Sequence, residues 1–336
     1  MYNIIRFFLF LFNPEFAHHL VMKSLKIANC FGLLTLVSKK IQCKPRVIMG
    51  LKFNNPVGLA AGLDKNAEYI DCLSNLGFGF IEIGTVTPRP QPGNSKPRSF
   101  RLTKEEGVIN RFGFNNDGID KAIENIQKSK FNGILGINIG KNFDTPINKA
   151  VNDYLVCFRK SYLYASYIVL NVSSPNTKNL RKLQEGENLE ELLKEIKEEQ
   201  KKLYKKYGKY VPFLLKISPD NTNSQLLFIC KLLIKYKIDG VIATNTTLSR
   251  TEVSKSKKRN ESGGLSGLPL RARSLKTLKF LKLNLGGKVP IIGVGGVMSG
   301  GDGKEKIDNG ADLIQIYSGL IFKGHKLIHE LCRAIK

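Results

Sequence analysis

The chain has 336 residues, of which 42% are hydrophobic and 31 are glycine, so it can bury one large core. With 53 Lys and Arg against 28 Asp and Glu, its formal net charge is +25, which favours nucleic acid, a membrane surface or an anionic small molecule as partner. The aromatic residues are not interleaved with the basic runs, as base stacking would require. We therefore expect no nucleic acid, and interpret the charge as compositional drift combined with anionic ligands.

The cysteines and histidines do not predict a metal site. The cysteines, at positions 30, 43, 72, 157, 230 and 332, include no C-x-x-C pair, which is typical of reduced thiols in a cytosolic protein. His325 and His329 have a spacing that can hold a metal on a helix, but no recognisable motif adds an acidic third ligand. We favour ordinary surface histidines and expect no metal.

The N-terminal segment is apolar but short. Residues 4–12 are almost entirely hydrophobic, whereas a bilayer span needs roughly 20 residues. Asn13 as N-cap, Pro14 at the first helical position and Glu15 in the first turn then predict a helix that runs towards Gly32. A further apolar segment covers 33–37. We assign 1–44 to short amphipathic helices that lie on a membrane without crossing it, while a helical hairpin capping the floor of the main domain fits the residues equally well.

From residue 45 onwards, short apolar runs alternate with helical stretches. The helices are expected over 67–76, 117–129, 147–164, 189–207, 223–236, 270–283, 304–309 and 320–335. The runs number eight, which is the count of a closed (β/α)8 TIM barrel over 45–336. They cover 57–60, 80–84, 133–137, 167–170, 213–217, 241–243, 289–294 and 313–316.

Long connections predict covers over one end of this barrel. Residues 99–102 and 107–110 alternate in polarity and predict a small hairpin over the barrel mouth. The polar loop 176–190 and the Lys- and Gly-rich loop 250–267 have the composition of lids.

Polar residues and glycines gather where the predicted strands end, which is the catalytic face of this fold. Exposed backbone N–H groups at Gly295-Gly296 and Ser318-Gly319, after the last two strands, suit a phosphate. Neither a G-x-G-x-x-G motif nor a P-loop is present, so a phosphate-bearing cofactor inside a barrel indicates flavin mononucleotide (FMN). The strand-end residues are Asp64-Lys65, Thr85, Asn138, Asn171, Ser174, Asn176, Lys216, Thr244 to Thr246, Gly295-Gly296 and Tyr317 to Gly319.

Several motifs in this order resemble the dihydroorotate dehydrogenases, over nearly the whole chain. The resemblance is to the quinone-dependent, membrane-associated class, because the base position is Ser174 where the soluble class has cysteine, and because an N-terminal extension is present. The motifs are residues 60–65, 84–88, 110–116, 171–177, 243–247 and 293–296.

This resemblance implies oxidation of (S)-dihydroorotate to orotate in de novo pyrimidine (UMP) biosynthesis, with one FMN per subunit as hydride acceptor and ubiquinone or menaquinone as final acceptor. Ser174 is implied as the catalytic base, and we add the hypothesis that Thr177 and a water relay its proton. The implied FMN-binding residues are Ala61, Gly62, Leu63, Asp64, Lys65, Thr85, Asn138, Asn171, Lys216, Thr244, Gly267, Gly296, Tyr317 and Ser318. The implied substrate-binding residues are Lys65, Asn110, Arg111, Phe112, Gly113, Phe114, Asn171, Asn176, Asn245 and Thr246.

The resemblance also implies that the N-terminal helices form a quinone passage lined by His18 and Arg101. It implies a peripheral protein on the cytoplasmic side of the cell membrane, and we expect a monomer. One departure from the family lies at 299–303, where extra glycines should weaken the start of a helix.

Three other functions stay open. A tRNA dihydrouridine synthase would explain the basic charge, but it should carry a catalytic cysteine and an RNA-binding helical domain. A non-catalytic basic barrel that binds nucleic acid would purify without colour. A soluble, fumarate-linked dehydrogenase would turn over with fumarate.

Overall fold

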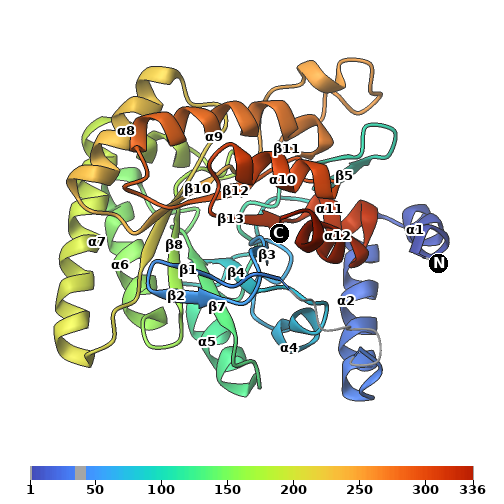
Figure 1. Cartoon of the computed structure of the whole chain (residues 1–336), viewed down its shortest axis with the longest axis horizontal. Helices are drawn as coiled ribbons and strands as arrows, with labels where there is room; N and C mark the ends of the chain where they lie inside the picture. The colour runs from blue at the N-terminus through green and yellow to red at the C-terminus, as the bar shows by residue number, and fades with distance from the viewer. Residues whose placement is uncertain (1, 35–42, 336) are drawn as a thin grey trace.

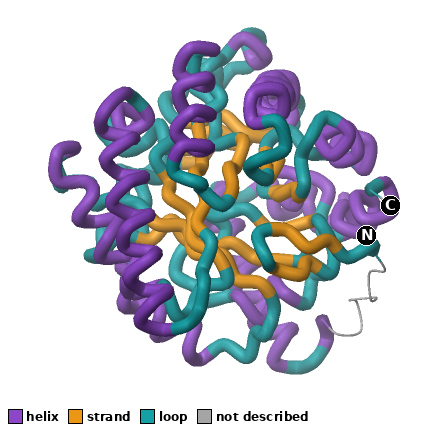
Figure 2. The backbone as a smooth tube through the Cα atoms, turned by 60° about the vertical axis from the view of Figure 1, so that its left-hand side comes forward, coloured by secondary structure: helices purple, strands orange, loops and turns teal. Residues whose placement is uncertain are grey.

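A closed barrel of parallel strands forms the centre of the molecule (Figures 1 and 2). The computed structural model describes residues 2–34 and 43–335. Around the barrel the strand order is β3, β4, β7, β8, β9, β10, β12 and β13, which confirms the predicted (β/α)8 fold. Their bounds are β3 Val57–Leu59, β4 Phe80–Val86, β7 Ile134–Ile139, β8 Tyr167–Asn171, β9 Phe213–Ile217, β10 Gly240–Ala243, β12 Ile291–Val294 and β13 Leu313–Ile316.

The barrel interior is filled by side chains, so it is a core and not a channel. Phe80 and Tyr167 cross the interior, and their bulk is matched by glycines on neighbouring strands. A Cβ at Gly58 would lie 2.3 Å from the ring of Phe80, and one at Gly136 would lie 2.2 Å from the ring of Tyr167. Because glycine has no side chain, these positions leave room for the large rings, and the barrel core is closely packed.

The helices cover the outside of the barrel (Figure 2). Three differ most in extent from the prediction. The helix expected over 67–76 is only α4, and that over 304–309 begins earlier, as α10. The helix expected over 320–335 is interrupted at Gly324, whose φ of 73° breaks it into α11 and α12. The bounds are α4 Ile70–Ser74, α5 Gly118–Lys128, α6 Ala150–Ser161 with a 3₁₀ turn at Ile147–Lys149, α7 Gly186–Tyr207, α8 Asn223–Lys235, α9 Arg271–Leu285, α10 Gly300–Asp308, α11 Ser318–Lys323 and α12 Lys326–Ala334.

Helix α10 begins at Gly300, despite the glycines expected to weaken it. The Ser299 hydroxyl accepts the backbone N–H of Asp302 at 3.2 Å and donates to the Asp302 carboxylate at 2.9 Å. This N-cap satisfies a donor that would otherwise be free at the helix start. The stabilisation from this N-cap therefore offsets the backbone conformational entropy that the glycines lose when the helix forms.

Two small sheets close the ends of the barrel. The predicted hairpin forms as β5 (Ser99–Leu102) and β6 (Gly107–Asn110), and β11 (Gly264–Gly267) from the loop 250–267 adds a third strand. The other sheet, β1 (Arg46–Ile48) and β2 (Leu51–Phe53), was not predicted. Phe53 at its end packs against Phe80 inside the barrel, with ring centroids 5.1 Å apart, so this hairpin closes the floor.

Two N-terminal helices lie beside the barrel mouth, where the first packs against α11 and the second against α4 and β5 (Figure 1). They are α1 (Tyr2–Leu11) and α2 (Pro14–Cys30), and the Asn13 side chain caps α2 as predicted, accepting the N–H of Glu15 at 3.0 Å. The Tyr2 hydroxyl donates to the carbonyl of Ile321 at 2.6 Å, and Arg98 pairs with Glu15 at 2.7 Å. The alternative of a helical hairpin under the floor is therefore wrong. The expected segment 33–37 falls partly outside the described residues.

The outer surface of α1 is apolar. None of its residues is buried, and Phe7, Phe8 and Leu11 are among its most exposed side chains. None of the described helices combines the length and the apolar character that crossing a bilayer requires.

Candidate functional site

A cavity lies at the C-terminal ends of the barrel strands, where the polar ring was predicted. The structure brings most of the predicted site residues together in its lining. These are Ala61, Gly62, Lys65, Thr85, Asn110, Phe112, Gly113, Phe114, Asn171, Ser174, Asn176, Lys216, Thr244, Asn245, Thr246, Gly267, Gly296, Tyr317 and Ser318.

Four predicted residues lie outside this lining. Leu63 and Asp64 line a second cavity instead, and the Asp64 carboxylate accepts the backbone N–H groups of Glu68 and Tyr69 at 3.0 and 2.8 Å. Arg111 points towards the loop 250–267, where it pairs with Glu261 at 2.8 Å. The fourth, Asn138, lies behind the cavity wall.

Asn138 belongs to a chain of hydrogen bonds that supports the cavity floor. Thr85 donates to Asn138 at 2.6 Å and accepts from the Asn171 amide at 2.9 Å. The Asn138 amide in turn donates to Glu82 at 2.8 Å. Since each side chain fixes the next, Asn138 contacts the cavity through Thr85.

Glu82 is a fully buried carboxylate beneath the cavity. Lys216 lies 3.5 Å from it, and Gln315 and Tyr167 donate to its other oxygen at 2.5 and 3.3 Å. A buried charge needs such pairing and hydrogen bonds. The contact with Glu82 therefore holds the Lys216 side chain in the cavity wall, where it suits an anionic or electron-rich ligand.

The loop after β8 carries Ser174 and two buried polar atoms that lack a protein partner. The Ser174 hydroxyl accepts the N–H of Asn176 at 3.3 Å, and the Asn176 amide donates to Asn110 at 3.1 Å. Among the described residues, Asn176 Oδ1 and Thr177 Oγ1 are buried without a hydrogen-bond partner. Because such atoms are costly to leave unsatisfied, they indicate a ligand or ordered water here.

Asn245 joins this loop to the next strand end. Its amide donates to Asn171 at 3.1 Å and to the Ser173 hydroxyl at 3.0 Å, and its carbonyl oxygen accepts the N–H of Thr246 at 2.8 Å. The amides of Asn171 and Asn245 are thus oriented before any ligand binds, as a site for a planar polar ring requires.

On the opposite side, the backbone is shaped for an anion. Gly295 and Gly296 have φ values of 104° and 72°, and a Cβ at Gly296 would lie 2.3 Å from Cα of Arg271. The Ser318 hydroxyl lies 2.9 Å from that of Ser266, in the same wall. Successive glycine N–H groups with hydroxyls nearby fit a phosphate group.

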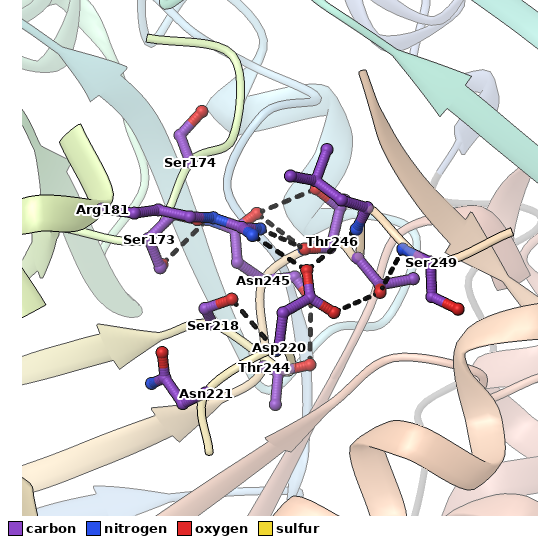
Figure 3. A network of polar contacts seen from close by, with 12 residues as sticks. Ser173, Ser174, Arg181, Ser218, Asp220, Asn221, Thr244, Asn245, Thr246 and Ser249 are labelled. Carbon is purple, nitrogen blue, oxygen red and sulfur yellow. Dashed lines mark hydrogen bonds and ion pairs between the residues drawn. The ribbon is translucent and has the colours of Figure 1, made fainter. Parts of the chain in front are cut away.

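Sequence reasoning missed several residues of this region. Gln315 and Met298 line the cavity, and Arg181 and Asp220 form an ion pair beside the Ser174 loop (Figure 3). Asp220 follows closely on the end of β9, which is the signal that could have identified it. Arg181 gives no such signal, because it is one basic residue among many in a polar loop.

The second cavity lies between α1, α2 and the barrel and has a volume of about 850 Å³. Most of its lining is apolar, and it contains both predicted quinone-passage residues, His18 and Arg101. Burial, and to a smaller extent Lys65, lowers the pKa of His18 to about 3, so this imidazole is neutral at pH 7. Arg101 lies over the ring of Phe10, 4.5 Å from its centroid.

The two cavities share a wall. Lys65, Phe112 and Tyr317 line both of them, and Nζ of Lys65 lies 4.4 Å from the ring centroid of Phe112. Burial and the nearby Arg98 lower the pKa of Lys65 to about 8. The site thus pairs a polar cavity with an apolar one across a single layer of side chains.

Comparison with known proteins identifies close relatives along the whole chain. The family model described as "Dihydroorotate dehydrogenase" matches residues 45–336. The protein named "Dihydroorotate dehydrogenase (quinone)" from Methylobacillus flagellatus is 55% identical over 335 residues, covering 100% of this chain and 99% of its own. A protein of the same name from Buchnera aphidicola is 56% identical over 332 residues, covering 99% of each chain.

Solved structures have the same fold. The crystal structure of DHODH in complex with ferulenol from Eimeria tenella superposes with a TM-score of 0.86 at 35% sequence identity, covering 96% of this chain and 90% of that one. A ligand-free structure from the same organism has a TM-score of 0.86 at 36% identity and covers 96% of this chain and 94% of its own.

Proposed function

This chain belongs to the dihydroorotate dehydrogenase family, and from that premise we propose which of its residues carry out each half of the reaction. It is a quinone-dependent oxidoreductase that oxidises dihydroorotate to orotate in pyrimidine biosynthesis. The observation that supports the assignment best is the convergence of Ser174, the amides and Lys216 on one cavity.

The family is one of flavoproteins, and FMN is the cofactor that we propose, one per subunit. The donors present fit this group: Gly295, Gly296 and Ser318 for the phosphate, and Lys216 with Asn171 and Thr85 for the polar edge of the ring. When bound, the flavin supplies a two-electron acceptor for the hydride from C6 of the substrate. Ala61, Gly62, Lys65, Thr244, Gly267 and Tyr317 complete the proposed set in the cavity lining. Leu63, Asp64 and Asn138 support that set from outside the lining.

Dihydroorotate is a carboxylated ring with an imide edge, and the cavity offers partners for both. Lys65 is the cation for the carboxylate, and the amides of Asn110, Asn176 and Asn245 are donors and acceptors for the ring. The free Asn176 Oδ1 is then a ligand contact. Phe112, Gly113, Phe114 and Thr246 shape the rest of the substrate site, and Arg111 supports it by holding the loop 250–267 through Glu261.

Ser174 is the proposed base that removes the C5 proton. Ser174 as a residue is only 6% exposed, so bulk water has little access to it. A serine hydroxyl is a weak base unless its proton can leave, and Thr177 Oγ1, buried without a partner in the same loop, is the proposed relay through an ordered water.

The apolar cavity is the proposed quinone site, with residues 1–44 as its N-terminal segment and 45–336 as the catalytic barrel. The exposed apolar surface of α1 supports peripheral attachment to a membrane, and the side that we propose is the cytoplasmic side of the cell membrane. Ubiquinone or menaquinone fits an apolar cavity of this volume. We further propose that the protein acts as a monomer.

A single assay tests this function. The yellow holoenzyme should reduce a short-chain quinone when given dihydroorotate, and Ser174→Ala should slow flavin reduction by roughly 10²–10⁴-fold while the reduced flavin is reoxidised by quinone at an unchanged rate. Glu195→Ala, on the exposed surface of α7, is the control variant. Equal turnover with fumarate, or a Ser174→Ala protein as fast as the parent, would contradict the proposal.

A further inference from the structure

Arg181 holds three neighbouring strand ends together beside the proposed active site (Figure 3). It lies in the 3₁₀ helix Leu180–Gln184, within the loop that carries Ser174. Its guanidinium donates to the Ser173 carbonyl at 3.1 Å, to the Asp220 carboxylate at 2.8 Å and to the Thr246 carbonyl at 3.0 Å. Those partners follow β8, β9 and β10 respectively.

The contact with Ser173 acts on the residue proposed as base. The Ser173 carbonyl belongs to the peptide unit that joins Ser173 to Ser174, so a hydrogen bond to that oxygen fixes the plane from which the Ser174 side chain extends. Figure 3 shows the Ser174 hydroxyl pointing away from the guanidinium. Arg181 therefore acts on Ser174 through the backbone and does not contact its side chain.

Asp220 in turn holds Arg181 in place. Its carboxylate also accepts the N–H of Leu248 at 2.8 Å and a short hydrogen bond from the Thr247 hydroxyl. The side chains of Arg181 and Asp220 are 22% and 21% exposed, so solvent screens this pair less than a surface pair. Because Thr247 and Leu248 hold the two oxygens of this carboxylate, Asp220 offers the Arg181 guanidinium a fixed partner for a charge-assisted hydrogen bond.

We propose that Arg181, held by Asp220, is a positioning residue for proton abstraction, because it sets the orientation of the Ser173–Ser174 peptide and hence of the Ser174 hydroxyl. The inference rests on the proposed role of Ser174. Arg181 itself touches neither substrate nor flavin, since it is absent from the lining of the cavity. Its third hydrogen bond, to the Thr246 carbonyl, fixes the position of this substrate-binding residue relative to the loop that carries Ser174.

The guanidinium shape explains why arginine is needed. Nε and both terminal nitrogens each serve a different acceptor, which is a fork that a lysine ammonium cannot reproduce. Arg181→Lys should therefore keep the charge and lose the orientation.

The test compares the two half-reactions in the full-length holoenzyme. Arg181→Gln should slow anaerobic flavin reduction by dihydroorotate by roughly 10²-fold, the size expected when a reacting group moves by about 1 Å. Reoxidation by a short-chain quinone should be unchanged, and the dissociation constant of orotate, measured from the flavin spectrum, should change by only a few-fold. Arg181→Lys and Asp220→Asn should show the same pattern with smaller losses.

An isotope effect separates positioning from a general structural role. Deuterium at C5 of dihydroorotate should slow flavin reduction by a larger factor in Arg181→Gln than in the parent, because proton abstraction becomes more limiting. Lys178→Gln is the matched control, since it removes one positive charge from an exposed site in the same loop. It should leave both the rate and the isotope effect unchanged.

The rates of the two variants distinguish the positioning role of Arg181 from the proposed role of Ser174 as base. If Ser174→Ala is slow and Arg181→Gln is as fast as the parent, the positioning role is wrong and the proposed base stands. If Arg181→Gln loses flavin, or slows both half-reactions equally with no change in the isotope effect, Arg181 is structural and the inference is overturned. If Ser174→Ala itself is as fast as the parent, the proposed base and this inference both fail.

Discussion

The two cavities differ in how they are built. The polar one is made by the ends of barrel strands, and its side chains are fixed by one another, as in the chain from Asn171 through Thr85 to Asn138. The apolar one is formed by α1 and α2 against the barrel, and these helices are attached by a few contacts, such as those of Tyr2 with Ile321 and Glu15 with Arg98. The first is therefore rigid and specific, whereas the second can be perturbed by itself.

The strongest test of this difference removes the second region entirely. Deleting residues 1–40 should reduce quinone-dependent turnover to the background rate, because α1 and α2 form one whole side of the apolar cavity. Flavin reduction by dihydroorotate should persist, because the hydrogen bonds that orient Asn171, Thr85 and Asn245 all lie within the barrel. Steady-state turnover with a short-chain quinone and stopped-flow flavin reduction measure the two rates. Loss of both rates, or of neither, would show that the regions are not separable.

Thr177→Ala tests whether the Thr177 hydroxyl relays the proton that Ser174 gives up. Flavin reduction should slow by roughly 10- to 10²-fold, within the range of a single proton-transfer contribution, because Thr177 Oγ1 is the unpartnered hydroxyl beside the base. Thr177→Ser keeps a hydroxyl and should restore most of the rate in the same stopped-flow experiment. An alanine variant as fast as the parent would exclude the relay.

Lys65 lies in the wall between the two cavities. The pH dependence of catalysis tests whether its cation binds the substrate in the polar cavity. A lysine is charged below its pKa, and the pKa of Lys65 is about 8, so kcat/KM for dihydroorotate should fall roughly fivefold between pH 8 and pH 9 as the cation is lost. Lys65→Met should remove this limb and bind substrate more weakly. If the variant keeps the limb, another group is responsible.

The smallest expected effect concerns His18. Its pKa in the folded state, about 3, is below the ordinary value of 6.5, so its contribution to stability is complete above pH 6.5 and decreases as the pH falls towards 3. Amide hydrogens of α2 should therefore exchange a few-fold faster at pH 6 than at pH 7 after correction for intrinsic rates, while barrel amides do not. His18→Gln should remove the difference, and the exposed neighbour His19→Gln should keep it.

The sequence predicted the barrel well because each of its strands is a local apolar run that ends in a polar residue or a glycine. Most cavity residues followed from that rule, since parallel strands bring their ends to one face. Contacts between distant segments could not be read in the same way. β11 pairs with β6 across a long stretch of chain, and β1 with β2 is too short to give a periodic signal.

Contacts between distant segments also explain why four predicted site residues lie outside the cavity lining. Asp64 and Asn138 stand at strand ends as the rule requires, but the direction of each side chain depends on partners elsewhere, the N–H groups of Glu68 and Tyr69 for one and Thr85 with Glu82 for the other. Arg181 is the opposite case, a residue that was not predicted but that the structure brings into contact with the site. Its role comes from hydrogen-bond acceptors on three separate loops, which its own position in the sequence does not reveal.

The wall of Lys65, Phe112 and Tyr317 has a consequence for inhibition. The cavities proposed for a carboxylated ring and for a lipid-soluble ring are separate and share only these side chains in their linings. Orotate should therefore compete with dihydroorotate and not with quinone, and a hydrophobic inhibitor of the second cavity should show the opposite pattern. A molecule that joined both chemistries would have to displace Phe112, so inhibitors of the two cavities are best developed as separate compounds that act together.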